Sequence, residues 1–229
     1  MKQFTSRDSL LHGRHTEVSD LTIADQMIGG LAETLAVLSF LPASITSEIR
    51  RLQLRLLDEF GDAVYVNPTD TLHVTLFEVM GVQCLHNATS PILSTEEHKI
   101  LIKACSQSIG SSTPVELLFN HVLASEKAII LLADDPSELN SMREQICSIL
   151  GKTLPYKAPP QIAHCTIARF NQAIPLSVVN EFLRPISIRA KYSMREYQLV
   201  NGHRVPLLRY DVLDRFVADL SNTGYQLAV

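Results

Sequence analysis

Two segments of the chain alternate between apolar and polar residues with a period of two. The first runs from Thr71 to Val79 (TLHVTLFEV) and the second from Ile162 to Phe170 (IAHCTIARF). Successive side chains of a β-strand point to opposite faces, so this alternation predicts half-buried strands. In each predicted strand one face is apolar and the other carries a histidine and a threonine.

Helical periodicity predicts a different set of elements. Between Ser44 and Phe60 the apolar residues recur at three- and four-residue intervals, and Gly61 follows as a helix stop. Further helices are predicted over residues 96–109, 137–150 and 175–183. Short apolar runs predict strands over residues 34–41, 63–66, 115–123, 127–133, 193–200 and 206–212. Asn201-Gly202 predicts a hairpin turn between the last two strands.

The order of these elements indicates an α+β fold with antiparallel sheets, because strands and helices are mixed and several adjacent strands are joined by short turns. A strand, a helix, a strand and the first histidine strand follow one another near the start, and a related order with a histidine strand among strands and helices occurs in the second half. This similarity indicates a diverged internal duplication. We expect an N-terminal extension over residues 1–32, one domain of two lobes over residues 33–213, and a C-terminal tail over residues 214–229.

Composition limits the classes of function. Hydrophobic residues are 46% of the chain and charged residues 19%, which is ordinary for a globular protein. The formal net charge of -4 disfavours a protein that binds long, stable duplex nucleic acid. The first residues lack a signal-peptide pattern, and no apolar run is long enough to span a membrane. A cytoplasmic protein without a membrane partner is therefore expected.

Local charge and cysteine spacing add two expectations. The segment from Arg184 to Arg209 contains six basic residues against one acid, Glu196. Such an excess suits a small phosphorylated ligand, but it is also typical of a solvated face. The four cysteines form no CxxC pair, so neither a zinc site nor a disulfide framework is expected, and reduced thiols are the prediction.

The polar faces of the two alternating strands carry the candidate chemistry. His73 and Thr75 share one face, and His164 and Thr166 share the other strand's equivalent face. Phosphodiester cleavage needs one group that accepts a proton and one that donates a proton, and histidine suits both roles near neutral pH. Threonine hydroxyls can bind non-bridging phosphate oxygens. A single His-x-Thr is common on structural strands, whereas two copies on alternating strands favour a metal-independent catalytic pair.

The two segments resemble the paired HxT signatures of the two-histidine (2H) phosphoesterase superfamily. This group includes RNA 2',3'-cyclic phosphodiesterases, LigT-like 2'-5' RNA ligases and cyclic nucleotide phosphodiesterases. Asn67-Pro68 before the first motif and Ala168-Arg169 after the second are also similar to the family, and the order of elements matches over residues 33–213. The resemblance implies two pseudo-symmetric lobes around a central cleft, with one HxT strand from each lobe and helices outside.

The resemblance also implies an activity and residue roles. His73 is the expected proton donor and His164 the expected acceptor, with the two labels exchanged when the reaction runs in the other direction. Thr75 and Thr166 are expected to bind the phosphate. The implied reaction is hydrolysis of a nucleotide or short-RNA 2',3'-cyclic phosphate without a cofactor. Two alternatives remain open: a 2'-5' oligonucleotide phosphodiesterase, and a nucleotide-binding module of the same fold without turnover.

Three further residues are candidates for substrate binding. Phe77 lies on the His73 face of a regular strand, where it could stack on a base or pack in the core. His203 lies in the basic segment and could contact a phosphate. Arg169 follows the second motif, but a regular strand would direct it to the face opposite His164, where it would form a structural pair. The sequence pattern gives no oligomeric state.

Overall fold

The structure is a computed structural model that describes residues 31–84, 93–134, 137–151, 153–154, 156, 158–204 and 207–219. Most of the extension expected over residues 1–32 lies outside these ranges. The helices and strands run in the order β1 (Leu31–Phe40), α3 (Ala43–Phe60), β2 (Val64–Val66), β3 (His73–Cys84), α4 (Thr95–Gly110), β4 (Val115–Ala124), β5 (Ile129–Ala133), α5 (Ser137–Leu150), β6 (His164–Phe170), α6 (Leu176–Leu183), β7 (Ala190–Met194), β8 (Glu196–Arg204) and β9 (Arg209–Val217).

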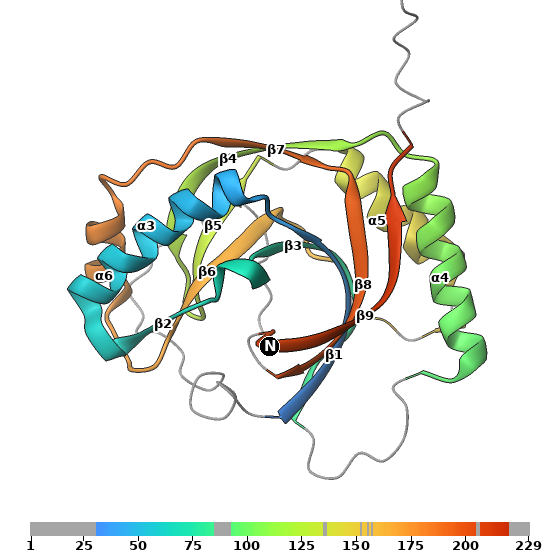
Figure 1. The fold of residues 1–229 in the computed structure, drawn as a ribbon, viewed down its shortest axis with the longest axis horizontal. Helices are drawn as coiled ribbons and strands as arrows, with labels where there is room; N and C mark the ends of the chain where they lie inside the picture. Colours follow the sequence, from blue (N-terminus) through green and yellow to red (C-terminus); the bar gives the residue numbers. More distant parts are fainter. Residues whose placement is uncertain are drawn as a thin grey trace, which may run out of the picture.

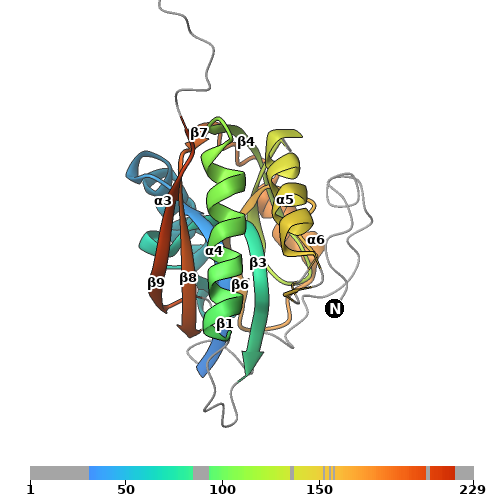
Figure 2. The ribbon, with the colours of Figure 1, turned by 90° about the vertical axis from the view of Figure 1, so that its right-hand side faces the viewer.

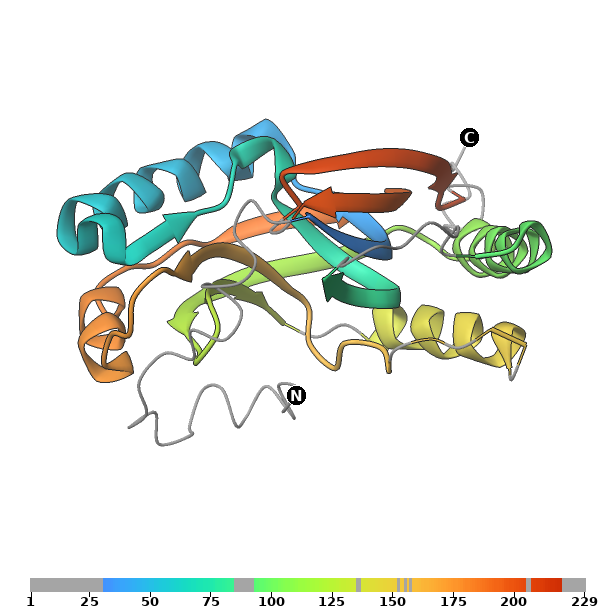
Figure 3. The same ribbon diagram turned by 90° about the horizontal axis from the view of Figure 1, so that it is seen from below.

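Two antiparallel sheets form the centre of the fold. One has the strand order β3-β1-β8-β9 and the other the order β2-β6-β5-β4-β7. Figure 1 shows α3 and α6 on one side of the sheets and α4 and α5 on the other, and Figure 2 looks onto α4 and α5 in front of the strands. Figure 3 shows the two sheets as two layers between these helix pairs. The predicted α+β class, with antiparallel sheets and helices outside, is confirmed.

The two halves of the chain repeat one arrangement. In the first half β1 and α3 precede the histidine strand β3, and β3 pairs antiparallel with β1. In the second half β5 and α5 precede the histidine strand β6, and β6 pairs antiparallel with β5. The halves are interleaved, because β2 from the first half pairs with β6 of the second. This arrangement agrees with the predicted internal duplication.

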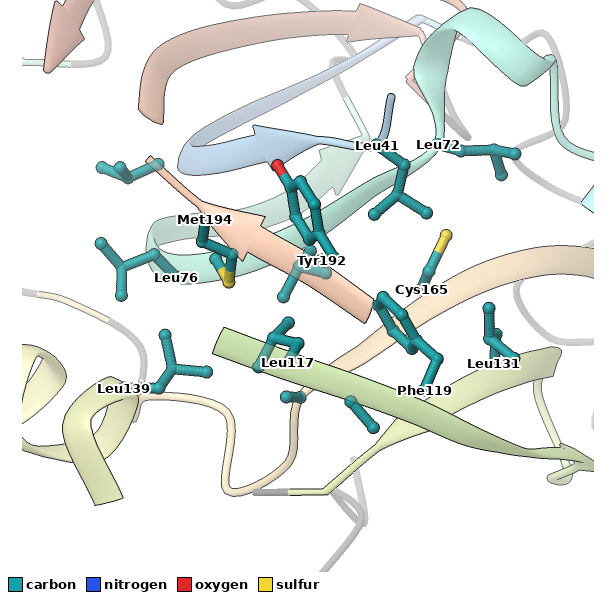
Figure 4. Packing of buried hydrophobic residues seen from close by; sticks show 14 of the residues in the cluster. Leu41, Leu72, Leu76, Leu117, Phe119, Leu131, Leu139, Cys165, Tyr192 and Met194 are labelled. Atoms are coloured by element: carbon teal, nitrogen blue, oxygen red, sulfur yellow. The ribbon is translucent and has the colours of Figure 1, made fainter. Parts of the chain in front are cut away.

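The core lies between the sheets and under the helices. The apolar stripe of α3 is buried from Ile45 to Leu56, and Gly61 ends the helix in the left-handed region with φ 54°. Figure 4 shows Tyr192 of β7 with its paired residue Leu117 of β4, and Phe119 and Cys165 belong to the same buried cluster. Burial of each such side chain stabilises the fold by about 1.5–3 kcal/mol relative to an exposed position. These contacts fix the spacing between the strands.

Two strand boundaries differ from the prediction. The strand expected over residues 193–200 is divided at Arg195, where the chain leaves the sheet of β7 and enters the sheet of β8. Residues 214–217, expected in the tail, continue β9 and pair with β8. A pattern of apolar residues does not show where a continuous extended segment changes from one sheet to another.

The predicted hairpin turn at Asn201-Gly202 is wrong, because β8 runs through both residues to Arg204. Glycine is needed there for a close approach between strands: a Cβ on Gly202 would lie 2.6 Å from Cγ2 of Thr34. The left-handed residue after β8 is Leu207, with φ 60°. The Asn-Gly pair therefore marks crowding between β8 and β1 and not a turn.

The expectations from composition can be compared with the described residues. Among them, no helix is both long and apolar enough to cross a bilayer. All six basic residues between Arg184 and Arg209 are exposed, which agrees with a solvated face. Cys105, Cys147 and Cys165 are free, as predicted. Burial raises the pKa of the Cys105 and Cys165 thiols to about 12, so neither is a reactive thiolate.

Candidate functional site

Each histidine strand has a β-bulge three residues after its histidine, and β3 has further register shifts nearer its C-terminal end. The pairing of β3 with β1 gains an extra residue at Leu76, and the pairing of β6 with β5 gains one at Ile167. A bulge changes which side chains face each side of the sheet. Residues 73–79 and 164–170 consequently share one sequence of buried and half-buried positions, with two successive buried residues after the bulge begins. The duplication therefore extends to the backbone irregularity beside each HxT motif.

The bulges reverse two expectations about facing direction. Phe77 is 0% exposed, and its ring packs against Tyr156 with the centroids 5.4 Å apart. The suggestion that Phe77 stacks on a base is not met, because the bulge turns this ring into the core. Arg169 is turned the other way, onto the face of His164 and Thr166, where its positive charge lowers the pKa of both site histidines.

His203 lies on the side of its sheet away from the candidate site. Its Nε2 is 2.8 Å from Oδ2 of the exposed Asp211 on β9. The preceding residue, Tyr210, stacks on Phe40, and Phe40 makes an edge contact with the ring of His73. Because successive strand residues point to opposite faces, Asp211 and its histidine partner lie on the outer face. The suggestion that His203 contacts a phosphate in this site is not supported.

The two site histidines have matching backbone anchors. Nδ1 of His73 donates a hydrogen bond of 2.6 Å to the carbonyl oxygen of Thr71. His164 forms a backbone hydrogen bond with Ile162, also two residues earlier. This contact fixes the ring of each histidine, and in His73 it leaves Nε2 as the nitrogen that can exchange a proton with a ligand.

The histidine strands lie side by side, and their ionisable groups affect one another. Burial lowers the pKa of His164 to about 4, and the charges of His73, Arg143 and Arg169 act in the same direction. Burial also lowers the pKa of His73, against the opposing effect of its bond to Thr71. Both rings are therefore neutral near pH 7 in the unliganded protein.

Hydrogen-bonding groups without partners surround these rings. Among the described residues, the hydroxyls of Thr75 and Thr166 have no hydrogen-bond partner. Nε of Arg169 is buried and likewise has no acceptor within the described ranges. Buried donors are normally satisfied, so an unpaired guanidinium next to two imidazoles indicates a place for an anion. Hydroxyl and guanidinium N–H groups are donors that suit phosphate oxygens.

Apolar side chains next to the motifs explain why the histidines lose hydration. Leu38 pairs with Thr75 in the first sheet, and Ile130 pairs with Thr166 in the second. These residues belong to two small buried clusters, one on each histidine face. The first contains Ala36, Leu38, Val200 and Leu207, and the second contains Leu123, Ala128, Ile130, Leu132 and Ile162. Low polarity around both motifs favours the neutral form of each imidazole.

A third histidine lies in the same row as His164. His121 on β4 pairs with Leu132 on β5, and Leu132 pairs with His164 on β6. Directly paired residues share a sheet face, so His121 faces the same side as the second HxT motif. His121 lacks the neighbouring threonine that marks the two motifs, so only the strand register reveals its place.

Buried polar side chains hold the bulge in β6. Nδ2 of Asn67 donates to the carbonyl oxygen of Thr166 at 2.9 Å, and Nε2 of Gln53 donates to that of Ile167 at 2.9 Å. Asn67 follows β2 and Gln53 lies on α3, so both donors come from the first half of the chain. They satisfy carbonyls that the bulge removes from regular pairing.

A buried arginine holds the corresponding carbonyls of β3. Nη2 of Arg143 donates to Thr75 and Nε donates to Leu76, each at 3.1 Å. Arg143 comes from α5 of the second half, so each lobe braces the histidine strand of the other. The sequence signal was present but missed: Arg143 occupies the apolar stripe of α5, four residues after Leu139 and three before Ile146.

Within the described ranges, no group of three or more histidine, cysteine, aspartate or glutamate side chains is arranged to hold a metal ion.

Known structures share this fold. TT0787 of Thermus thermophilus is 17% identical, with a TM-score of 0.61 over 80% of this chain and 97% of that chain. E. coli LigT complexed with 3'-AMP is 17% identical, with a TM-score of 0.61 over 82% and 98%. The MHV ns2 PDE domain is 15% identical, with a TM-score of 0.52 over 73% and 97%. No family model matches the sequence, and no curated protein matches it. The predicted resemblance is confirmed as a likeness of fold.

Proposed function

We propose that this chain, which has the fold of LigT, is a metal-independent phosphodiesterase that hydrolyses a nucleotide or RNA 2',3'-cyclic phosphate. The observation that carries the proposal is the combination of two neutral imidazoles with unpartnered hydroxyl and guanidinium donors from two paired motifs. The fold likeness adds support, because LigT has been crystallised with 3'-AMP, ATP and NADP+, and the MHV domain is described as a PDE domain.

The proposed reaction divides the proton transfers between the two histidines. Neutral His164 accepts a proton from water while the water oxygen forms a bond to phosphorus. The bond from phosphorus to one ribose oxygen breaks, and protonated His73 donates a proton to that leaving oxygen. The products are a phosphomonoester and a free ribose hydroxyl. Proton exchange with solvent then returns His164 to its neutral form and His73 to its protonated form.

The phosphate itself prepares this protonation state. In the free protein the pKa of each histidine is below its ordinary value, so both rings are neutral near pH 7. A bound phosphodiester carries a negative charge, which favours the protonated form of a nearby imidazole. Thr75, Thr166 and Arg169 hold the non-bridging oxygens, whose negative charge grows in the transition state. Binding and proton uptake by His73 are therefore expected to be linked.

A substrate panel tests the proposal in the presence of EDTA. It contains nucleoside 2',3'-cyclic phosphates, 2'-5' oligoadenylate and short RNA with a cyclic end. Wild-type protein is compared with His73→Ala, His164→Ala and a matched control, His203→Ala, whose ring lies on the outer face. Turnover of the cyclic substrates by the wild type and the control alone supports the proposal.

The other outcomes distinguish the alternatives. Cleavage of 2'-5' oligoadenylate with no cyclic phosphate hydrolysis would assign the chain to 2'-5' oligonucleotide phosphodiesterases. Tight nucleotide binding without turnover of any substrate would assign it to non-catalytic binding modules. Equal turnover by all four proteins would remove the two histidines from the chemistry.

A further inference from the structure

We propose that Arg143 is a positioning residue that ties β3 to the residues just before β6 and favours the proton-accepting form of His164. The proposal rests on the proposed function for the role given to His164. Arg143 touches no reacting atom in this scheme. It acts through the backbone on which both motifs are built.

One guanidinium joins β3 to the segment just before β6. On β3, Arg143 donates to the carbonyl oxygens of Thr75 and Leu76, which are the residue before the bulge and the extra residue of the bulge. Its Nη2 also donates to the carbonyl oxygen of Ile162 at 3.2 Å, two residues before His164. Because a guanidinium is planar and its donors have fixed directions, these bonds set the separation between the Thr75 and Ile162 backbones.

Arg143 and His164 share an acceptor. The backbone of Ile162 forms hydrogen bonds with both side chains. A change at Arg143 therefore alters the carbonyl that orients the imidazole. The same change removes a positive charge that disfavours protonation of that ring. The two contacts have different effects: the positive charge of Arg143 lowers the pKa of His164, whereas the hydrogen bond to Ile162 raises this pKa and orients the ring.

The two bulges are held by different kinds of side chain. The bulge of β6 is held by the neutral side chains of Gln53 and Asn67, whereas the bulge of β3 is held by an arginine. The HxT motifs, backbone anchors and bulges are duplicated, but this charge is not. It distinguishes two histidines that are otherwise similarly placed.

Other charged and titratable groups also face His164. They are His73 from β3, Arg169 from β6 and, in the same row of the sheet, His121 from β4. Arg169 lowers the pKa of both site histidines, whereas Arg143 is a cause of the lowered pKa of His164 only. The asymmetry between the two rings is therefore expected to depend on Arg143.

Burying the charge of Arg143 is an unfavourable way to stabilise the fold. The residue is 2% exposed, and removing a charged group from water is costly. An apolar side chain of similar volume often serves stability as well or better at such a position. Conversely, a side chain with several donors is needed to satisfy two carbonyl oxygens of β3 and the carbonyl oxygen of Ile162 at once.

The test measures the titration of His164 by NMR in the full chain without ligand. We expect Arg143→Met to move the His164 midpoint upward by about one pH unit, because a neighbouring positive charge is lost. The matched control is Gln53→Met, which removes the neutral brace and leaves every charge in place. We expect this control to unfold at a lower temperature while the His164 midpoint stays at the wild-type value.

Arg143→Lys separates charge from geometry. Lysine keeps the charge but cannot bond three carbonyls in a fixed plane, so the His164 midpoint should remain near the wild-type value. Turnover should still fall by about 10²-fold in kcat with little change in KM, because the two histidines lose their relative placement. An unchanged His164 midpoint together with a reduced kcat would not arise from a general destabilisation of the fold.

Three outcomes would overturn the proposal. The first is an unchanged His164 midpoint in folded Arg143→Met, and the second is an equal shift in Gln53→Met. The third is failure of both Arg143 variants to fold where Gln53→Met folds, which would make Arg143 a folding requirement only. The titration needs no substrate. If the wild type cleaves nothing on the panel, the proposed function fails while the effect of Arg143 on His164 is still decided.

Discussion

His73 and His164 are anchored in the same way, each by a hydrogen bond to the backbone of the residue two positions earlier. The two rings come from different lobes, yet they share the anchor, the neighbouring threonine and the bulge that follows. Their electrostatic surroundings differ, because the charge of Arg143 contributes to the lowered pKa of His164 and not to that of His73. A duplicated motif thus presents two similar imidazoles in unequal fields, which is what a general acid and a general base require.

Alanine substitution of either histidine should abolish most turnover. Each removes a proton-transfer group, so kcat should fall by about 10²- to 10⁴-fold. Because both groups act on one transition state, the double variant should lose far less than the product of the two single losses. Steady-state kinetics with a cyclic substrate would measure this, with His203→Ala as the unaffected control. Strictly multiplicative losses would argue against concerted use of the pair.

Loss of either site threonine should cost less than loss of a histidine. Thr75→Val and Thr166→Val each remove one hydrogen bond to a charged phosphate oxygen, which is worth about 1.5–3 kcal/mol. The proton-transfer groups remain, so kcat/KM should fall by roughly 10- to 150-fold. Comparable losses for the threonine and histidine variants would show that phosphate orientation, and not acid–base chemistry, limits the rate.

The pH dependence of kcat/KM should favour acidic solution. This parameter reports the free enzyme, in which the pKa of His164 is about 4 and that of His73 is below its ordinary value. The productive form has His164 neutral and His73 protonated, so kcat/KM should rise through about pH 4 and fall before about pH 6.5. Above that point the decline should be about tenfold per pH unit. A plateau from pH 6.5 to 8.5 would contradict this assignment.

The period-two pattern predicted much of the candidate site because the face of a strand is a local property. Alternation assigned His73, Thr75, His164 and Thr166 to polar faces. The apolar residues that alternate with them, such as Val74 and Cys165, are buried in the structure. The bulges were not predicted. Two adjacent apolar residues followed by a charge, as in Leu76 to Glu78, fit a regular two-sided strand equally well.

The remaining differences arise from contacts between distant parts of the chain. In the sequence, Arg143 is a polar residue that interrupts the apolar stripe of α5. Its three backbone carbonyl partners lie on distant segments, so the local pattern does not indicate them. The Asn201-Gly202 dipeptide is typical of a hairpin turn, so the sequence predicted one there. That prediction takes no account of Thr34 on the neighbouring strand, whose side chain leaves no room for a Cβ at Gly202. The pairing of β2 with β6 crosses between the halves, and no periodicity within either strand encodes it.

Stability should decrease as the solution is acidified from about pH 6.5 to pH 4. An unfolded histidine titrates near pH 6.5, whereas His164 in the fold titrates at about pH 4. Between these values the unfolded state binds more protons, so acid favours unfolding. The loss should be on the order of 2 kcal/mol for this partly solvated ring, with His73 acting in the same direction.

Denaturant unfolding at a series of pH values would measure that loss. His164→Ala should show a shallower decline over the same range, because one source of differential protonation is absent. Inorganic phosphate should also reduce the slope if it binds the folded site and raises the histidine pKa values. An equal slope in the wild type and in His164→Ala would show that other groups control acid stability.

Arg169 is expected to oppose stability while serving phosphate binding. Its Nε is buried without a partner among the described residues, and burial lowers the pKa of the guanidinium, which marks an unfavourable environment for the charge. Arg169→Met should therefore leave the thermal midpoint unchanged or raise it. The same variant should weaken inorganic phosphate binding by roughly 10- to 150-fold, because a charged hydrogen-bond donor is lost.

Isothermal titration with phosphate and thermal unfolding would measure both effects of Arg169→Met. Arg189→Met is the matched control, since Arg189 is exposed and its loss should change neither quantity. Arg169 also lowers the pKa of both site histidines, so their NMR midpoints should rise together in Arg169→Met. Reduced stability with unaltered phosphate affinity would instead mean that Arg169 is a structural cation, and the anion site would have to lie elsewhere.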